Sequence, residues 1–282
     1  MVPMMRAIEK ERCTAVLGVP TIFFDLMRYE RRHEYNLKSL KLAVLSGAPV
    51  SSALIRQIEH ELNIPHVTQI YGQTEAGRIA STSNVQLGDI TQHYESMGKC
   101  VPHREIKIID IVSKRVVPMG ESGEICTRSF RTMRGYWSNT TKTQEAIDDT
   151  QWLHTGDVGM LDANGCVYFR GRIKDVIIRG GINIFPLEIE AHLEQHPAIK
   201  RAQVFGIPDE RLGELVCAMI VTKCTVDIDE LRRFLTLDLA YFKIPTNILI
   251  VTEFPTTSTG KIQKFKLAEI MMQHLSIEKK DC

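Results

Sequence analysis

The sequence predicts an α/β segment, then a β-rich subdomain resembling a small barrel or antiparallel sheet, then a separate small α+β domain. The first part alternates strand-like and helix-like segments, which is typical of α/β units. The second has short alternating strands and an Asn164-Gly165 pair between apolar runs, a strong hairpin signal because both residues accept positive φ. The third mixes helical and strand-like segments after Pro186, a residue that suits the first turn of a helix.

The α/β segment is expected over residues 1–94. Leu42–Leu45 is an apolar run that ends in a Gly- and Pro-containing turn, which predicts a strand. Ser51 precedes apolar residues at helical spacing, so it is the expected cap of a helix. His66–Tyr71 is the next expected strand, and Gly72 is expected to end it.

The β-rich subdomain is expected over residues 95–173 and the α+β domain over residues 174–282, with Lys174 at the joint. Together these make about two domains, which suits a chain of 282 residues. The elements expected in the last domain are a helix from Pro186, strands at Ala202–Ile207, Val216–Thr222 and Ile248–Val251, a helix capped by Asp227, and a helix from about Ile262.

Composition excludes several classes of protein. A net charge of +1 argues against a nucleic-acid-binding arm or a membrane-surface patch. No apolar run reaches the ~18 residues that suggest a membrane span. The 7 cysteines are scattered without a Cys-x-x-Cys pair, which favours buried thiols in a reducing compartment over disulfides or zinc. We therefore expect no nucleic acid and no transmembrane segment; the oligomeric state is not readable from the sequence.

The segment Tyr71-Gly72-Gln73-Thr74-Glu75 follows an expected strand, where ligands gather in α/β sheets. Gly72 would let a ligand approach the backbone closely. The Thr74 hydroxyl can bond a phosphate oxygen, and Glu75 can hold Mg²⁺, which prefers oxygen ligands. The alternative is a polar turn ahead of a helix.

Two further segments carry polar groups suited to a nucleotide. Asp157, expected in a loop, can accept hydrogen bonds from ribose hydroxyls. Arg172 and Lys174 flank an apolar residue and would point the same way in extended chain. A guanidinium suits phosphate or ribose oxygens. The alternative for Asp157 is a common turn that contains Gly and Asp. The alternative for Arg172 and Lys174 is a solvated charged linker.

The segment Pro255–Lys261 is a polar loop that ends in a lysine before a helix. It is not a Walker A loop, because the first Gly and the preceding strand are missing. A lysine on a mobile loop makes a movable counter-charge for a developing phosphate anion. The alternative is a surface turn.

These segments together resemble the adenylate-forming superfamily of acyl-CoA synthetases, luciferases and peptide-synthetase adenylation domains. The resemblance rests on the order and spacing of seven segments: residues 46–49, 71–75, 123–126, 135–137, 152–157, 171–190 and 255–261. Residues 260–266 are most similar to the medium-chain fatty acyl-CoA synthetases, which include mitochondrial members.

The resemblance implies a fold and a reaction. Residues 1–173 would be the C-terminal part of an AMP-binding N-terminal domain, and residues 174–282 a mobile C-terminal domain that rotates at Lys174. A carboxylate would attack the α-phosphate of ATP to give an acyl-adenylate and pyrophosphate, with Mg²⁺ present. The CoA thiolate would then displace AMP, with a medium-chain fatty acid favoured.

The resemblance also implies roles for single residues. Lys261, Thr74 and Glu75 would be catalytic, with Lys261 bridging the carboxylate and the α-phosphate and Glu75 holding Mg²⁺. Gly180 and Gly181 would move toward the pantetheine channel in the second step. The residues implied in nucleotide binding are Gly47, Ala48, Pro49, Tyr71, Gly72, Gln73, Thr74, Asp157, Arg172 and Lys261, with Tyr71 against adenine and Asp157 and Arg172 on the ribose.

The sequence departs from the family pattern in three places. Ile182 stands where relatives often carry Glu, and Ser129 where they often carry Gly. The Ser/Thr/Gly-rich phosphate-binding loop followed by Pro-Lys is absent from these residues. We therefore expect a fragment that is inactive or weak by itself. The alternatives are an adenylation domain for a carrier protein and a catalytically inactive binding module. A mitochondrial matrix location is implied by analogy with the family, and the alternative is a cytoplasmic one. The analogy is the sole basis, because we find no targeting signal in these residues.

Overall fold

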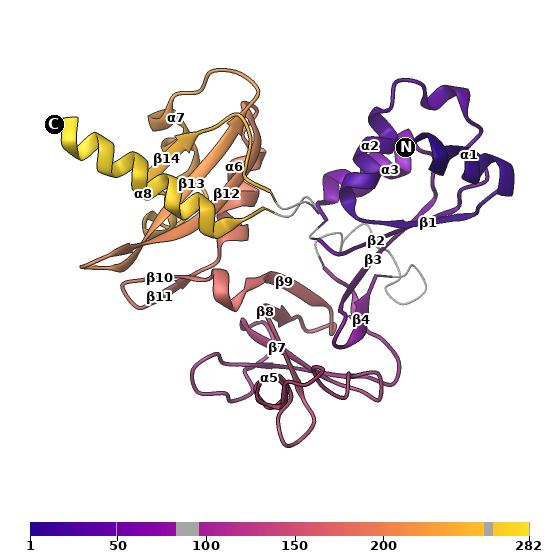
Figure 1. Cartoon of the computed structure of the whole chain (residues 1–282), viewed down its shortest axis with the longest axis horizontal. Coiled ribbons are helices and arrows are strands. Elements are labelled where there is room, and N and C mark those ends of the chain that lie inside the picture. Colours follow the sequence, from indigo (N-terminus) through magenta and orange to yellow (C-terminus); the bar gives the residue numbers. More distant parts are fainter. Residues whose placement is uncertain (49, 83–95, 257–261, 282) are drawn as a thin grey trace. The chain divides into compact units, whose positions relative to one another are not determined.

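The computed structural model describes residues 1–48, 50–82, 96–256 and 262–281 (Figure 1). The chain divides into two compact units, Met1–Phe169 and Arg170–Cys282, which we call the N-terminal and C-terminal units. The boundary lies within strand β9 (Val167–Arg172). Among the described residues, no helix is both long and apolar enough to cross a membrane.

The N-terminal unit begins with a five-stranded sheet in the order β1-β2-β3-β4-β5. Strands β1, β2 and β3 are parallel, and β4 and β5 are antiparallel to their neighbours. The strands are β1 (Ala15–Gly18), β2 (Leu42–Ser46), β3 (His66–Gln73), β4 (Gly77–Ser81) and β5 (Lys99–Cys100). The accompanying helices are α1 (Val2–Glu11), α2 (Pro20–Arg28) and α3 (Ser52–Glu61), with a 3-10 turn at Arg32–Glu34.

The strand–helix–strand prediction for this region is confirmed. The Ser51 side chain caps α3 by accepting the Leu54 backbone N–H at 3.2 Å, which satisfies a donor that the first helical turn leaves unpaired. One face of α3 is buried against the sheet and α2 in a core that includes Phe23, Leu26 and Leu45. Burial of this face, more than helix propensity, holds a helix of this length in place.

The predicted end of the third strand at Gly72 is wrong, because β3 continues through Gln73. The chain then turns and returns as β4, whose Gly77 pairs with Gln73, so an antiparallel strand follows instead of a helix. A Cβ at Gly72 would lie only 2.3 Å from the Gly77 carbonyl oxygen. The missing side chain of Gly72 therefore makes room for β4.

The second sheet of the N-terminal unit has the order β6-β7-β8-β9. Its other strands are β6 (Glu105–Ile109), β7 (Gly123–Arg128) and β8 (Leu153–Leu161), and helix α5 (Thr140–Ala146) precedes β8. The β6–β7 and β7–β8 pairs are antiparallel, and no β6–β9 pairing closes the sheet among the described residues. Of the two forms predicted for this subdomain, the structure thus has the antiparallel sheet and not a closed barrel.

The hairpin predicted at Asn164-Gly165 joins β8 to β9, but its turn differs from the one expected. Gly165 has a φ of +75°, whereas Asn164 is not among the residues with positive φ. The loop is longer than two residues, and Asp162 Oδ1 accepts the backbone N–H groups of Asn164 at 2.9 Å and Cys166 at 2.8 Å. Only one left-handed residue is needed in such a loop.

The C-terminal unit is a mixed sheet packed with helices, as predicted. The strand order is β11-β10-β13-β12, and β14 pairs in parallel with β13. The strands are β10 (Ile177–Arg179), β11 (Ile182–Ile184), β12 (Ile199–Asp209), β13 (Gly213–Thr222) and β14 (Asn247–Ile250). The helices are α6 (Pro186–Gln195), α7 (Ile228–Leu235) and α8 (Lys264–Asp281), with 3-10 turns at Ile173–Asp175 and Tyr241–Lys243.

Two local signals in this unit are confirmed. Pro186 occupies the first turn of α6, where its missing N–H costs nothing. Asp227 caps α7 by accepting the Asp229 backbone N–H at 2.9 Å. The faces of α6 and α7 that carry Leu193, Leu231 and Leu235 are buried in one core with β12 and β13.

Candidate nucleotide-binding site

Residues from two separate predicted motifs meet at Asp157. Its Oδ2 accepts a hydrogen bond from the Tyr71 hydroxyl at 2.9 Å and another from Gln73 Nε2 at 2.8 Å. Asp157 is 3% exposed, so these donors compensate the cost of burying its charge. The structure therefore joins the end of β3 to the middle of β8 through one carboxylate.

Asp157 lies inside β8 and not in a loop, contrary to the prediction. The local backbone is nevertheless irregular: Cys126 of β7 pairs with His154, and Glu124 pairs with Val158. Residues 155–157 thus stand opposite the single residue Ile125 as a bulge, and Gly156 takes a φ of +69°. Bulges re-aim side chains and are common beside functional sites. This bulge turns Asp157 toward Tyr71 and Gln73.

The bulge is tied to both neighbouring strands. The Thr155 hydroxyl donates to the Ile125 carbonyl at 2.7 Å, and the Thr155 carbonyl accepts Gln73 Nε2 at 2.8 Å. The Asp157 backbone N–H in turn donates to Thr155 Oγ1 at 3.1 Å. A single Gln73 amide thus contacts both ends of the Thr155–Asp157 segment.

Gly47 and Ala48 follow β2 and are exposed, and Pro49 lies outside the described residues. Gly47 has a φ of +83°, a left-handed conformation that favours glycine. Because β2 and β3 are parallel, their carboxyl ends meet at one sheet edge, where α/β proteins place ligands. This edge carries the residues 47–48 and 71–75 that the sequence singled out.

The Thr74-Glu75 pair forms the turn after β3, with Thr74 exposed and Glu75 half-buried. Glu75 Oε1 accepts the Tyr136 hydroxyl at 3.1 Å. Partial burial and then this hydrogen bond raise the pKa of Tyr136 above its ordinary value. A half-buried carboxylate oriented by a tyrosine fits the oxygen chemistry that Mg²⁺ requires. Sequence reasoning did not assign Tyr136 to the site.

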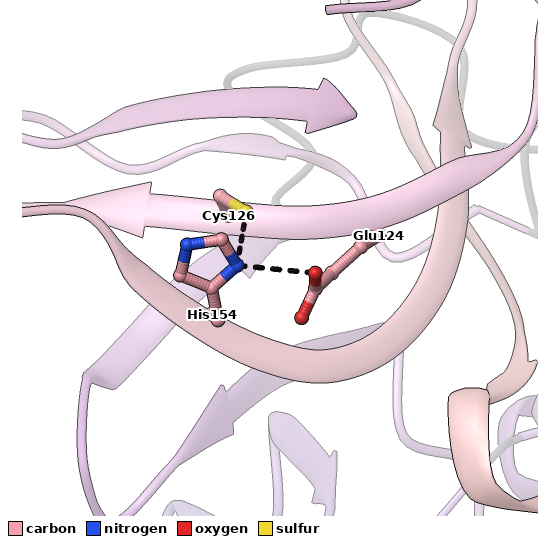
Figure 2. A group of neighbouring side chains, drawn as sticks. All are labelled: Glu124, Cys126 and His154. Atoms are coloured by element: carbon pink, nitrogen blue, oxygen red, sulfur yellow. Dashed lines mark hydrogen bonds and ion pairs between the residues drawn. The ribbon is translucent and has the colours of Figure 1, made fainter. Parts of the chain in front are cut away.

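Sequence reasoning also missed a cluster between β7 and β8 made of Glu124, Cys126 and His154, shown in Figure 2. His154 Nδ1 lies 3.1 Å from Glu124 Oε2 and 3.5 Å from Cys126 Sγ. Glu124 and Cys126 lie close together because they are two residues apart on one strand and therefore point to the same face of the sheet. The contact with His154 depends on strand register, which the sequence did not show.

The donors of this cluster are types that zinc accepts. One observation argues against a metal. The Lys114 ammonium already lies 3.3 Å from Glu124 Oε2 and supplies the positive charge that a cation would bring. Burial raises the pKa of the Cys126 thiol to about 12. The cluster is better described as a polar network around the Lys114–Glu124 ion pair.

Five predicted site residues belong to the C-terminal unit: Arg172, Lys174, Gly180, Gly181 and Lys261. Arg172 ends β9 and Lys174 lies in the following 3-10 turn, and both are exposed. The expectation that they point the same way is wrong in its premise, because the chain is not extended at Lys174. Lys261 lies outside the described residues.

Gly180 and Gly181 form the two-residue turn between β10 and β11, where Arg179 pairs with Ile182. Their φ values are +58° and +80°, which is the pattern of a type I′ turn. Such a turn needs positive φ at both positions. The turn therefore accounts for both glycines by itself, whether or not a ligand passes them.

Comparison with known proteins adds independent findings. Residues 2–137 match the family model of AMP-binding enzymes, and residues 188–261 match that of the AMP-binding enzyme C-terminal domain. The chain is 38% identical over 275 residues to the mitochondrial medium-chain acyl-CoA ligase ACSF2 of Bos taurus, covering 97% of this chain and 45% of that one. It is 37% identical to the putative acyl-CoA synthetase YngI of Bacillus subtilis, covering 95% and 49%.

Among solved structures, the amide bond synthetase McbA of Marinactinospora thermotolerans is similar with a TM-score of 0.86 and 31% identity, covering 96% of this chain and 54% of that one. The chain belongs to the AMP-binding, adenylate-forming enzyme family. Its similarity to medium-chain acyl-CoA ligases confirms the resemblance seen in the sequence. The chain spans about half the length of the curated relatives it matches.

Proposed function

We propose that this chain carries the ribose-binding and hinge parts of an ATP-dependent acid–CoA ligase. The observation that carries the proposal is the buried Asp157 carboxylate, held by Tyr71 and Gln73 at the carboxyl edge of a parallel sheet. A fixed carboxylate suits the paired hydroxyls of a ribose, because it accepts hydrogen bonds and donates none. Tyr71 and the backbone near Gly47, Ala48, Pro49, Gly72 and Gln73 would border the adenine.

The remaining residues take roles in two steps. Thr74 would bond a phosphate oxygen, and Glu75 would hold Mg²⁺, which supplies positive charge near the phosphates. Arg172 would bind the ribose from the C-terminal unit, and Lys261 would stabilise the charge that develops as the carboxylate attacks the α-phosphate. Rotation about Lys174 would then replace Lys261 by Gly180-Gly181, beside which the CoA thiolate attacks the acyl carbonyl and releases AMP.

A medium-chain fatty acid is the proposed acid, supported by the name of the Bos taurus relative. The same name supports a mitochondrial location, whereas the Bacillus subtilis relative is bacterial. Adenylation for another acceptor is a second candidate, because a similar structure is that of an amide bond synthetase. The choice of thiol or amine acceptor therefore needs a direct test.

The test supplies octanoyl-AMP to the chain, which removes the need for the first step. We expect octanoyl-CoA and AMP to form faster with CoA than in a protein-free control, and more readily than with an amine or a carrier-protein thiol. Lys261→Ala should leave this half-reaction largely unchanged, since Lys261 is proposed to serve only adenylation. With octanoate and ATP in place of the adenylate, we expect little or no product from these 282 residues.

Two results would overturn the proposal. A rate with octanoyl-AMP no higher than the protein-free rate would remove the ligase assignment from this chain. Loss of thioester formation from octanoyl-AMP in Lys261→Ala would show that Lys261 does not serve adenylation alone, and would remove the division of roles between the two steps. Robust octanoyl-CoA formation from octanoate and ATP would contradict the expectation of weak adenylation by this chain.

A further inference from the structure

The β8 bulge leaves backbone groups that the regular ladder cannot pair, and side chains of β7 and β8 supply partners. The Gly156 backbone N–H points to Glu124 Oε1 at 3.4 Å. The Thr155 hydroxyl donates a hydrogen bond to the Ile125 carbonyl, and Thr155 Oγ1 accepts one from the Asp157 backbone N–H. Glu124 is therefore a side-chain partner for the central residue of the bulge that carries Asp157.

The Glu124 carboxylate is itself held from its other oxygen. Glu124 is 4% exposed, and its Oε2 faces His154 Nδ1 at 3.1 Å and Lys114 Nζ at 3.3 Å. His154 Nε2 in turn lies 3.7 Å from Asp148 Oδ2. These contacts at Oε2 fix the carboxylate and leave Oε1 for Gly156. A buried carboxylate with such partners keeps one orientation, since any other would leave it unpaired.

We propose that Glu124, oriented by His154, is a positioning residue that fixes the Thr155–Asp157 bulge so that Asp157 meets the ribose of the bound nucleotide. The inference rests on the proposed nucleotide-binding function. Neither residue needs to touch the nucleotide. Glu124 acts through Gly156, one residue before Asp157, and His154 is the last regular residue before the bulge.

Cys126 provides the matched control. It belongs to the same cluster and contacts His154 Nδ1 at 3.5 Å (Figure 2), but no contact joins it to the bulge among the interactions of the described residues. Its removal should therefore leave Asp157 in place. In a metal site, by contrast, loss of the thiol would be as harmful as loss of the carboxylate.

The first test compares AMP with 2′,3′-dideoxy-AMP, which lacks both ribose hydroxyls, by calorimetric titration of the chain. Hydrogen bonds to a charged group are stronger than those between neutral groups, so we expect the wild-type chain to prefer AMP by roughly tenfold or more. Glu124→Ala should reduce this preference toward one while changing the affinity for dideoxy-AMP little. Glu124→Gln has one oxygen for both Lys114 and Gly156, so it should lose part of the preference. Cys126→Ala should retain all of it.

A general loss of folding would weaken both ligands equally and leave their ratio unchanged, so the ratio separates positioning from stability. An unchanged preference in Glu124→Ala would overturn the inference. So would a Cys126→Ala variant that loses the preference as fully as Glu124→Ala, because the role would then belong to the whole cluster as a metal site. A wild-type chain without any ribose preference would instead contradict the proposed function.

The second test needs no nucleotide. Hydrogen exchange of the Gly156 amide reports directly on its bond to Glu124. We expect faster exchange at Gly156 in Glu124→Ala than in wild type, with Cys126→Ala unchanged. Protection at Ile108 in the neighbouring β6 monitors the integrity of the sheet. Unchanged exchange at Gly156 in Glu124→Ala, with the sheet intact, would overturn the inference whatever the nucleotide does.

Discussion

At the scale of single residues, the site is built from polar groups whose environment the structure supplies. Tyr71 and Gln73 stood out in the sequence as parts of one motif, and Asp157 stood out as part of another. Their meeting depends on a pairing of β3 with the β8 bulge across 84 to 86 residues of chain. Glu124 and His154 could not be found from composition, because only strand register shows that they lie against each other.

Cys126 gives a prediction at this scale. Only the thiolate reacts with iodoacetamide, and burial raises the Cys126 pKa to about 12. At pH 8, we expect mass spectrometry to find the exposed Cys224 alkylated and Cys126 protected while the chain is folded. Rapid alkylation of Cys126 in the folded chain would contradict its burial.

The same pKa shift has a consequence for stability with a definite sign. Below pH 9, the ordinary value for this thiol, folded and unfolded chains both keep the proton. From about 9 to about 12 the unfolded chain loses it first, so the free energy of unfolding falls as pH rises. We expect Cys126→Ala to show a smaller decline over this range in urea titrations. An equal decline would assign the effect to other groups.

At the scale of elements, turn and cap signals were the most reliable part of the sequence. Ser51, Pro186 and Asp227 begin helices as predicted, because each satisfies a local need of the first turn. Strand ends were less predictable. Gly72 was expected to stop β3, yet β4 approaches its backbone closely and extends the strand, a tertiary contact that no local pattern shows.

Substitutions of Gly180 in the β10–β11 turn can distinguish a purely structural role of this turn from a role in CoA binding. Gly180→Asn should fold as well as wild type, since Asn-Gly suits a type I′ turn, whereas Gly180→Val should lower the free energy of unfolding by about 1–2 kcal/mol. If pantetheine passes this turn, Gly180→Asn should slow thioester formation from octanoyl-AMP and leave AMP affinity unchanged. An unchanged rate in Gly180→Asn would remove the turn from the CoA channel and leave it a purely structural role.

At the scale of the whole molecule, the sequence predicted an α/β segment, a β-rich subdomain and a small α+β domain, and the family comparisons confirm this fold class. Each unit has its own hydrophobic core, which explains why local patterns were enough to recognise it. Local patterns cannot predict the proposed alternation between two reaction steps in the same way. That alternation would depend on a movement of the units about Lys174 and on the position of Lys261 in each step, and the movement and the position are proposals.

The measurement that bears most directly on the nucleotide site is a titration of AMP into three versions of the chain. We predict that wild type and Asp149→Asn, which makes the same change at an exposed carboxylate, bind AMP equally well. Asp157→Asn should bind at least about tenfold more weakly, because it loses charged hydrogen bonds to the ribose. Equal affinity in all three, or no AMP binding by wild type, would contradict the role of Asp157.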